Sequence, residues 1–395
     1  MASLLWYVSL ATLALAALAG FDLVRGTRTI RSLRDVALGE AVPGPSLSVI
    51  VAARNEEREI EKALSSLLHQ DYQPMELIVV NDRSTDGTGE ILRKLSRDNK
   101  RLKIISVESL PKGWLGKNHA LYKGVCESRG ELLLFTDADV VMDPSTVRRA
   151  VNCLLGSGLD HFTLAPRILT RGIPLEIAVG VFSMFLALLS RPWKAGDPSS
   201  SASIGIGAFN LVGREAYERV GAHKAIAMCP DDDLKLGRLI KQNGFRQEFL
   251  RGGDLIQVRW YDSVGELIDG LMKNTFAVAN YRISLIVAGS AAQFVLCVWP
   301  FLGVFLTAGW TRMTNILIVL LIWILCWEGA RFAGLRKWFI LGFPLGALLM
   351  IYIAWRAMLK TLIQGGIIWR GTYYPLADLK RADDPTHPRS SQVAR

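Results

Sequence analysis

The stretch that decides the fold is Glu-Leu-Leu-Leu-Phe-Thr-Asp-Ala-Asp-Val-Val, residues 131–141. Its apolar run from Glu131 to Phe135 has the length and composition of a buried β-strand, and it leads directly into Asp137 and Asp139. Two carboxylates so close together repel each other unless a cation neutralises them. Hard divalent ions such as Mg²⁺ or Mn²⁺ prefer oxygen ligands and also bind phosphate oxygens. A pair of this kind is common in loops, but at a strand end it predicts a cation site.

Similar short runs surround this strand along the chain. Leu47 to Ala52, Glu76 to Val80 and Leu102 to Val107 are β-rich, and segments with helical spacing separate them. Continuous apolar strands between helices indicate an α/β domain with a mostly parallel sheet that is covered on both faces. Ligands of such sheets bind at the carboxyl ends of the strands, where Asp82 and Asp137 stand. We expect a further strand over Ile204 to Leu211.

Asp82 belongs to the motif Val-Val-Asn-Asp-Arg-Ser-Thr-Asp-Gly-Thr, residues 79–88. An acid at a strand end, followed by a tight turn and a helix, can accept hydrogen bonds from a nucleobase or a ribose. The same letters also fit a plain strand–turn–helix connection in which Ser84 and Asp86 serve the turn or the helix cap. The motif alone leaves both interpretations open.

A third acidic motif is Pro-Asp-Asp-Asp-Leu-Lys-Leu-Gly, residues 230–237. Its three consecutive acids open a predicted helix, where the helix dipole favours negative charge. The structural explanation is therefore a charged helix terminus. The functional one is a general base that takes a proton from an acceptor hydroxyl.

Two basic motifs complete the set. Residues 111–120 place glycines around Lys117, whose charge suits a phosphate, although the pattern is not a P-loop. Residues 255–261 place Arg259 beside Trp260, which suits a pyrophosphate and a sugar or lipid face. Trp260 and Tyr261 fit interfacial anchors equally well.

The amino-terminal end predicts a membrane anchor. Leu4 to Val24 is almost wholly apolar and has the length of roughly 20 residues that a spanning helix needs. No basic residue precedes it, whereas four arginines follow within residues 25–34. The positive-inside rule therefore predicts an amino terminus outside and a cytoplasmic middle domain. A cleaved signal peptide, with Ala17-Leu18-Ala19 as its site, is the alternative.

The carboxyl-terminal part predicts three further spans, at Ser284 to Gly309, Met313 to Gly329 and Trp338 to Leu359. Three spans would leave the tail outside, but the basic residues after them argue that it stays inside. One segment could be re-entrant, with the Gly342 to Pro344 break as a candidate. Ile173 to Leu189 is apolar but contains Glu176 and is flanked by Arg171 and Arg191, so we expect an interfacial helix there rather than a span.

The overall composition agrees with a membrane-bound protein. Half of the 395 residues are hydrophobic and the net charge is +10, concentrated in short segments beside the apolar ones. This pattern fits anionic lipid headgroups better than a nucleic acid, which we exclude as a partner. The five cysteines form no CxxC pair and the five histidines lack metal-ligand spacing, so we expect structural roles for them.

Taken in chain order, the motifs resemble the family 2 glycosyltransferases, which are inverting enzymes with the GT-A fold. The match begins with Ala-Arg-Asn-Glu at residues 53–56 and covers roughly residues 46–282. The chain is most similar to the membrane-bound branch that includes ceramide glucosyltransferases and hopanoid- or carotenoid-associated glycosyltransferases.

The resemblance implies a role for each matched position. Contacts to a nucleotide-sugar, a UDP-sugar in the first instance, fall on Ala53, Arg54, Glu56, Asp82, Lys117 and Asp137. A Mg²⁺ or Mn²⁺ ion falls on Asp139 and Asp137. Catalysis falls on Asp233 as the base, with Asp232 beside it. Acceptor or diphosphate contacts fall on Gln257, Arg259 and Trp260.

Two departures from the family pattern matter. The familiar last motif is Gln-x-x-Arg-Trp, but Gln257 is one residue too close to Arg259. Asp232 stands where many members have glutamate. The segment Trp-Arg-Gly-Thr-Tyr-Tyr, residues 369–374, resembles a motif near the end of these proteins, and we expect it near the membrane.

Together these inferences predict four regions: an anchor helix at 1–25, a GT-A domain at 43–282, transmembrane helices at 283–360, and at 361–395 a juxtamembrane motif followed from Leu376 by a polar, disordered tail. The expected function is sugar transfer to a lipid acceptor by an integral protein of the plasma or inner membrane, with its catalytic domain in the cytoplasm. A processive polysaccharide synthase and a non-catalytic membrane scaffold on the same fold remain the alternatives.

Overall fold

A computed structural model describes residues 2–39, 44–336 and 338–383 of the chain. It divides into two compact units, and each is interrupted in sequence by the other. The sheet unit consists of Ile30–Leu169, Pro192–Trp260 and Arg381–Arg395. The helical unit consists of Met1–Thr29, Thr170–Arg191 and Tyr261–Lys380. The predicted GT-A domain, 43–282, therefore contributes two segments to the helical unit. The predicted linker Pro43-Gly44-Pro45 lies partly outside the described residues.

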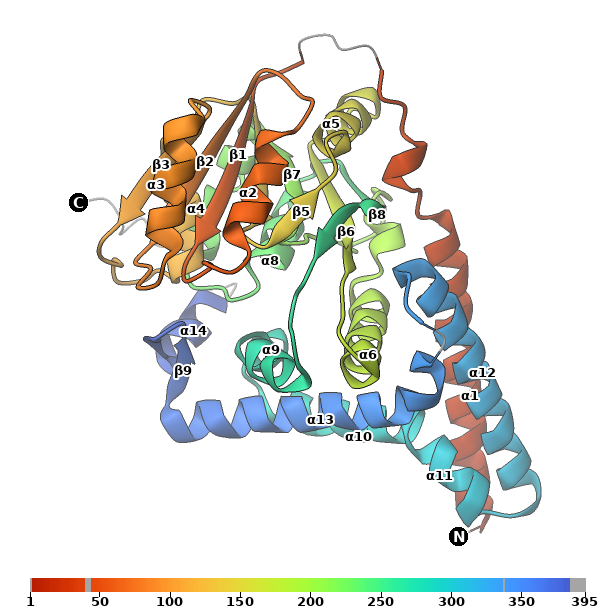
Figure 1. The fold of residues 1–395 in the computed structure, drawn as a ribbon. Coiled ribbons are helices and arrows are strands. Elements are labelled where there is room, and N and C mark those ends of the chain that lie inside the picture. Colours follow the sequence, from red (N-terminus) through yellow and green to blue (C-terminus); the bar gives the residue numbers. More distant parts are fainter. Residues whose placement is uncertain (1, 40–43, 337, 384–395) are drawn as a thin grey trace. The chain divides into compact units, whose positions relative to one another are not determined.

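The sheet unit contains an eight-stranded sheet in the order β3-β2-β1-β4-β7-β6-β8-β5 (Figure 1). The first four of these strands in the spatial order are mutually parallel, which confirms the predicted parallel sheet. They are β3 (Leu102–Val107), β2 (Met75–Asp82), β1 (Leu47–Ala53) and β4 (Leu132–Asp137).

The other half of the sheet is mixed. Strand β7 (Asn210–Gly213) runs antiparallel to both of its neighbours, β4 and β6 (His161–Ile168). Strand β6 pairs in parallel with β8 (Gln247–Val258), which carries β5 (Val140–Met142) antiparallel at the edge. The predicted strand over 204–211 is wrong in its first part, because only the residues from Asn210 join the sheet.

Helices cover both faces of this sheet. Alternate residues of β1 show why, since Val49 and Val51 belong to one apolar core and Ile50 to the other. The first core is closed by α2 (Ile60–Leu68), α3 (Thr88–Asp98) and α5 (Thr146–Gly156). The second is closed by α4 (Gly116–Cys126), α7 (Arg214–Arg219) and α8 (Asp232–Gln242).

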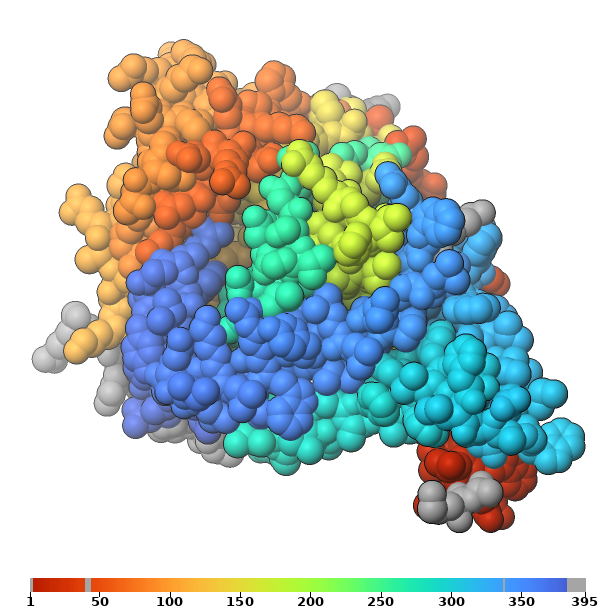
Figure 2. Space-filling view, turned by 60° about the horizontal axis from the view of Figure 1, so that its bottom comes forward, coloured from red at the N-terminus to blue at the C-terminus, as the bar shows by residue number. Residues whose placement is uncertain are grey.

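The helical unit is built mainly from long apolar helices. They are α1 (Ala2–Thr29), α6 (Ile173–Ser190), α9 (Val264–Val278), α10 (Ile283–Cys297), α11 (Trp299–Leu306), α12 (Gly309–Ala333) and α13 (Phe339–Gln364). Figure 2 shows α13, in blue, running along α9 and α6, which it contacts, as it also contacts α10. Helix α1 packs against α12, and Gly20 allows the close approach, because a Cβ there would lie 2.7 Å from Leu325.

Among the described residues, four helices are long and apolar enough to cross a bilayer, and up to five if the α10–α11 pair forms one span. The predicted span Ser284 to Gly309 is in fact this pair, which bends by 49° between Cys297 and Trp299. Pro300 lies in the first turn of α11, where its missing N–H costs nothing. The break we considered at Gly342 to Pro344 does not occur, because α13 continues through Pro344.

Helix α6 is one of the four candidate spans, although we expected an interfacial helix there. That expectation depended on the charges of Glu176 and of the flanking Arg171 and Arg191. In the structure Glu176 is buried inside the helical unit, where it accepts the backbone N–H of Arg336 and lies 4.0 Å from its Nε. A carboxylate paired in this way no longer argues against a span.

The carboxyl-terminal segment is more regular than predicted. After α13 the chain forms a hairpin of β9 (Gly366–Trp369) and β10 (Thr372–Pro375), which contains the predicted juxtamembrane motif. Helix α14 (Leu376–Asp383) follows, where we predicted a disordered tail. Arg370 and Gly371 have positive φ angles of 46° and 76°, as a two-residue hairpin turn requires. The rest of the predicted tail, 384–395, lies outside the described residues.

Candidate active site

Three adjacent parallel strands end at one edge of the sheet and deliver the predicted polar residues there. Asp82 is the last residue of β2 and Asp137 the last of β4, with β1 between them. The register pairs Ala52 with Asp137 and Ala53 with Asn81, so Arg54 follows directly at the same edge. The fold therefore brings together side chains that lie far apart in sequence.

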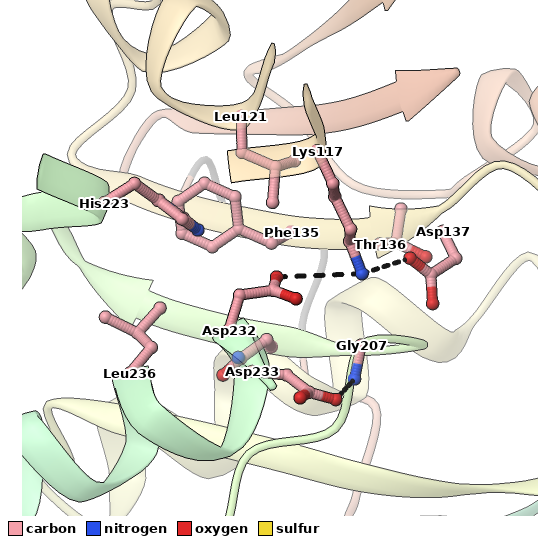
Figure 3. A pocket seen from close by; sticks show the side chains of 11 residues that line it. Lys117, Leu121, Phe135, Thr136, Asp137, Gly207, His223, Asp232, Asp233 and Leu236 are labelled. Atoms are coloured by element: carbon pink, nitrogen blue, oxygen red, sulfur yellow. Dashed lines mark hydrogen bonds and ion pairs between the residues drawn. The ribbon is translucent and has the colours of Figure 1, made fainter. Parts of the chain in front are cut away.

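Lys117 is the centre of the site (Figure 3). Its Nζ lies 2.8 Å from Oδ1 of Asp137 and 3.7 Å from Oδ2 of Asp232. Burial alone would lower the pKa of this lysine, but the surrounding carboxylates of Asp137, Asp232 and Asp233 outweigh it and raise the pKa. Lys117 therefore carries a fixed positive charge at the place where the chain gathers negative charge.

Asp232 and Asp233 come to this pocket from the first turn of α8, as the sequence predicted for three acids at a helix start. Oδ1 of Asp233 accepts the backbone N–H of Leu234 at 2.8 Å, and Oδ2 accepts that of Gly207 at 2.7 Å. Burial and the neighbouring charge of Asp232 raise the pKa of Asp233 above its ordinary value. A carboxylate with a raised pKa and a fixed direction is suited to accept a proton.

Asp139 stands in the turn between β4 and β5. Burial, followed by the charges of Asp137 and Glu56, raises the pKa of its carboxyl group. Within the described ranges no three His, Cys, Asp or Glu side chains form a group that could hold a metal by themselves. The carboxylates here instead fit a Mg²⁺- or Mn²⁺-type ion that takes one or two protein oxygens and completes its shell with phosphate oxygens and water.

Asp82 is closely paired in the structure. Nε and Nη2 of Arg83 donate to its two carboxylate oxygens at 2.7 and 2.9 Å, and Nη1 of Arg54 lies 3.7 Å away. Gly116 permits this arrangement, since a Cβ there would lie 2.4 Å from Oδ2 of Asp82. The predicted turn role of Asp86 is present, since its Oδ1 accepts the backbone N–H of Thr88 at 3.0 Å, but no side chain caps α3. Ser84 Oγ and Asp86 Oδ2 instead accept the N–H groups of Asn55 and Glu57.

The last predicted motif lies apart from the pocket around Lys117. Arg259 follows the end of β8 and its Nη1 lies 3.2 Å from Oε1 of Glu59. Gln257 donates to the backbone oxygen of Asp254 at 3.3 Å. Neither they nor Trp260 line the pocket that contains Asp137 and Asp233.

Several residues of the pocket were not predicted as site residues from the sequence. Gly207, Asn210 and His223 line it, and Phe135 and Leu236 form its apolar walls. Two of these follow Ile204, in a segment that we interpreted as a strand. The repeated glycines at 205 and 207 were the only available sign that its backbone would approach other groups closely.

Residues 48–168 match the family model of glycosyl transferase family 2. The chain contains a family 2 glycosyltransferase domain. The match includes β1, β2 and β4, which carry the site edge, together with Lys117 and the Asp137–Asp139 pair.

Curated relatives extend beyond this domain. A 4,4'-diaponeurosporenoate glycosyltransferase of Staphylococcus haemolyticus is 24% identical over 272 residues, which cover 66% of this chain and 69% of the relative. An uncharacterized glycosyltransferase of Haemophilus influenzae is 35% identical over 153 residues, which are 39% of this chain and 43% of that protein. A 4,4'-diaponeurosporenoate glycosyltransferase of Staphylococcus aureus USA300 is 26% identical over 219 residues, which are 55% of this chain and 56% of that protein. The chain therefore spans about half the length of the Haemophilus influenzae and Staphylococcus aureus relatives. The predicted similarity to carotenoid-associated glycosyltransferases is confirmed.

A solved structure confirms the predicted GT-A fold. The mannosyltransferase PcManGT of Pyrobaculum calidifontis, in complex with GDP-Man and Mn²⁺, superimposes with a TM-score of 0.56 at 20% identity. The superposition covers 90% of this chain and 99% of that one. At this identity the likeness establishes the fold of the glycosyltransferase domain and not its substrates.

Proposed function

We propose that this chain is a membrane-bound, inverting glycosyltransferase that transfers a sugar from a nucleotide-sugar, in the first instance a UDP-sugar, to the hydroxyl of a lipid. One observation carries the proposal: Lys117, Asp137, Asp232 and Asp233 converge on one pocket at the strand ends of a family 2 glycosyltransferase domain. The relatives that act on a carotenoid-related acid, by their names, support an apolar acceptor.

The geometry supports a single displacement. In this proposal the acceptor hydroxyl gives its proton to Asp233 while its oxygen attacks the anomeric carbon. The bond from that carbon to the diphosphate oxygen breaks, and the nucleoside diphosphate leaves from the opposite face. One displacement inverts the configuration. The hydrogen bonds from Gly207 and Leu234 leave further lone pairs of the Asp233 carboxylate available for the hydroxyl.

Charge neutralisation is the second requirement of the reaction. A Mg²⁺ or Mn²⁺ ion, when bound, would supply Lewis-acid stabilisation of the leaving diphosphate. Asp139 and Asp137 would hold it, since their oxygens gather negative charge beside the β4 strand end. Lys117 would exchange its contact with Asp137 for a phosphate oxygen of the donor. Arg259 lies outside the pocket in this structure, so we propose for it at most a contact made after the donor binds.

Nucleoside recognition falls on the other strand end. In the proposal Asp82 accepts a hydrogen bond from the base or ribose, and the segment from Ala53 to Glu56 forms the adjacent wall. Arg83 donates one hydrogen bond to each oxygen of Asp82, and each oxygen keeps a further lone pair for this contact.

The cellular location follows from charge and hydropathy. The four arginines at residues 25–34, in and just after the end of α1, favour a cytoplasmic position for the sheet unit. The four or five candidate spans among the described residues favour an integral membrane protein.

The test is transfer by the full chain in detergent, with a panel of UDP- and GDP-sugars and a total lipid extract. The proposal expects transfer from one donor to one lipid fraction, its loss with EDTA, and its loss in Asp139→Ala. A polymeric product would favour the processive synthase instead. No nucleotide release with any donor, and no donor binding with Mn²⁺ or Mg²⁺, would contradict the proposal.

A further inference from the structure

The segment Ile204–Gly207 reaches the pocket without belonging to the sheet. Strand β7 begins only at Asn210, so the backbone N–H groups of these residues have no strand partner. Buried backbone donors need an acceptor, and here side chains provide it. The N–H of Ile204 donates to Oε1 of Gln247 at 3.0 Å, and the N–H of Ile206 donates to Oγ1 of Thr163 at 3.1 Å.

Both acceptors are rigid because they lie inside the sheet. Gln247 on β8 and Thr163 on β6 are 1% and 0% exposed. The hydroxyl of Thr163 also donates to the backbone oxygen of Phe209 at 2.7 Å, which fixes its rotamer. The two residues therefore form a clamp on the Ile204–Gly207 segment, and we use the word clamp for this pair.

A buried histidine orients Gln247. The Nε2 amide nitrogen of Gln247 donates to Nδ1 of His161 at 2.6 Å and to the backbone oxygen of Gly237 at 3.2 Å. An amide nitrogen can only donate, so Nδ1 of His161 carries a lone pair, and Nε2 of the histidine donates to Oδ1 of Asn210. If the amide were flipped, its oxygen would face the Gly237 oxygen. The network thus leaves Gln247 one orientation, with its oxygen toward Ile204.

The clamped segment rests directly on the start of α8. A Cβ on Gly205 would lie 2.0 Å from the backbone oxygen of Asp233, and one on Gly237 would lie 2.3 Å from that of Ile204. Two backbones in such close contact move together. The backbone N–H of Gly207, directly after the clamped N–H of Ile206, donates to Oδ2 of Asp233 at 2.7 Å.

We propose that Gln247 and Thr163 are positioning residues for the transfer reaction, because by clamping Ile204–Gly207 they keep the Gly207 N–H on Asp233 and fix the direction of that carboxylate. This inference rests on the proposed function of Asp233. Neither residue touches the pocket itself. Loss of the clamp should therefore lower kcat and leave donor binding largely unchanged.

The test compares near-isosteric variants of the full chain in detergent. Thr163→Val and Gln247→Met remove the acceptors while keeping volume, and Thr163→Ser keeps the hydroxyl. Thr146→Val is the matched control: Thr146 is fully buried and its hydroxyl donates to the backbone oxygen of Leu255 on β8 at 2.7 Å, and not to the Ile204–Gly207 segment. Two quantities are measured: hydrogen–deuterium exchange of peptides covering 203–209, and kcat with the donor KM.

We expect Thr163→Val and Gln247→Met to exchange faster over 203–209 and to lose about tenfold in kcat, with a donor KM within about twofold of wild type. Thr163→Ser should stay near wild type in both measurements. Thr146→Val should lower the thermal midpoint and change neither. If Gln247→Met does not fold, the Thr163→Val and Thr163→Ser pair decides alone.

Two results would overturn the inference. Unchanged exchange in Thr163→Val would show that the clamp does not hold the segment. Faster exchange with unchanged kcat would show that the segment does not position Asp233. A wild-type protein that transfers no sugar would instead contradict the proposed function, and with it the positioning role, while the exchange data would still report on the clamp.

Discussion

Nζ of Lys117 lies 2.8 Å from Oδ1 of Asp137, so a lysine of the same chain pairs with the strand end that we propose to hold a divalent ion. The lysine side chain is 22% exposed and also lies 3.7 Å from Asp232. In the donor-free protein it is the cation that offsets the clustered carboxylates. This role can be separated experimentally from phosphate binding.

We predict that Lys117→Gln lowers the stability of the metal-free protein by about 2 kcal/mol, because it leaves several carboxylates without their cation. Mn²⁺ should restore a larger part of the thermal midpoint in this variant than in wild type. Lys112→Gln, at an exposed lysine of the same motif, is the control. An unchanged midpoint in Lys117→Gln without metal would contradict the assigned role.

For Gly237, the close contact with Ile204 predicts a stability effect of alanine opposite to the one that helix propensity predicts. It lies inside α8, where alanine is favoured over glycine by about 1 kcal/mol. Because a Cβ would lie 2.3 Å from the Ile204 oxygen, we expect Gly237→Ala to destabilise the protein by about 2 kcal/mol and to lower kcat. Gly156→Ala in α5 has no neighbour within 4 Å and should be neutral or slightly stabilising. Chemical denaturation with activity measurements checks both, and similar behaviour of the two variants would show that the contact is not tight.

His161 predicts how stability depends on pH. Burial lowers the pKa of this histidine to about 4 in the folded protein, whereas in the unfolded chain it is near 6.5. Between these values the unfolded chain binds the proton, so stability contributed by the neutral ring is present above pH ~6.5 and is lost as the pH falls toward 4. The full effect is on the order of 3 kcal/mol.

Thermal midpoints measured across this pH range check the histidine prediction. His161→Gln should flatten the decline, even though it lowers stability at neutral pH by disrupting the contacts to Gln247 and Asn210. His69→Gln, at an exposed histidine, should retain the wild-type slope. If His161→Gln showed that same slope, the buried histidine would not be its cause.

Local patterns predicted the elements that carry the acids. The run before Asp137 and the run before Asp82 are each short, apolar and followed by a polar turn, which is enough to define a buried strand and its end. The acids at 231–233 start α8 for the same local reason, since helix amino termini favour negative charge.

Interactions between distant residues explain what the sequence could not predict. The letters from Ile204 to Leu211 suit a strand, but the N–H groups of Ile204 and Ile206 bond to side chains from β8 and β6 instead. Hydropathy also could not predict the bend before Trp299 or the unbroken α13. Pro300 lies in the first turn of α11, where its missing N–H costs nothing, whereas Pro344 lies inside α13 without ending it. The spacing of residues along the chain does not predict such contacts between distant segments.

The most direct measurement of the central claim is the kcat of Asp233→Asn, made together with donor affinity in the same preparation. The amide keeps the size of the carboxylate but cannot take a proton from the acceptor. We predict a loss of roughly 10²–10⁴-fold in kcat, with nucleotide-sugar affinity in the presence of Mn²⁺ close to that of wild type. Full turnover in Asp233→Asn would contradict the account, because the carboxylate held by Gly207 and Leu234 would then not be the base.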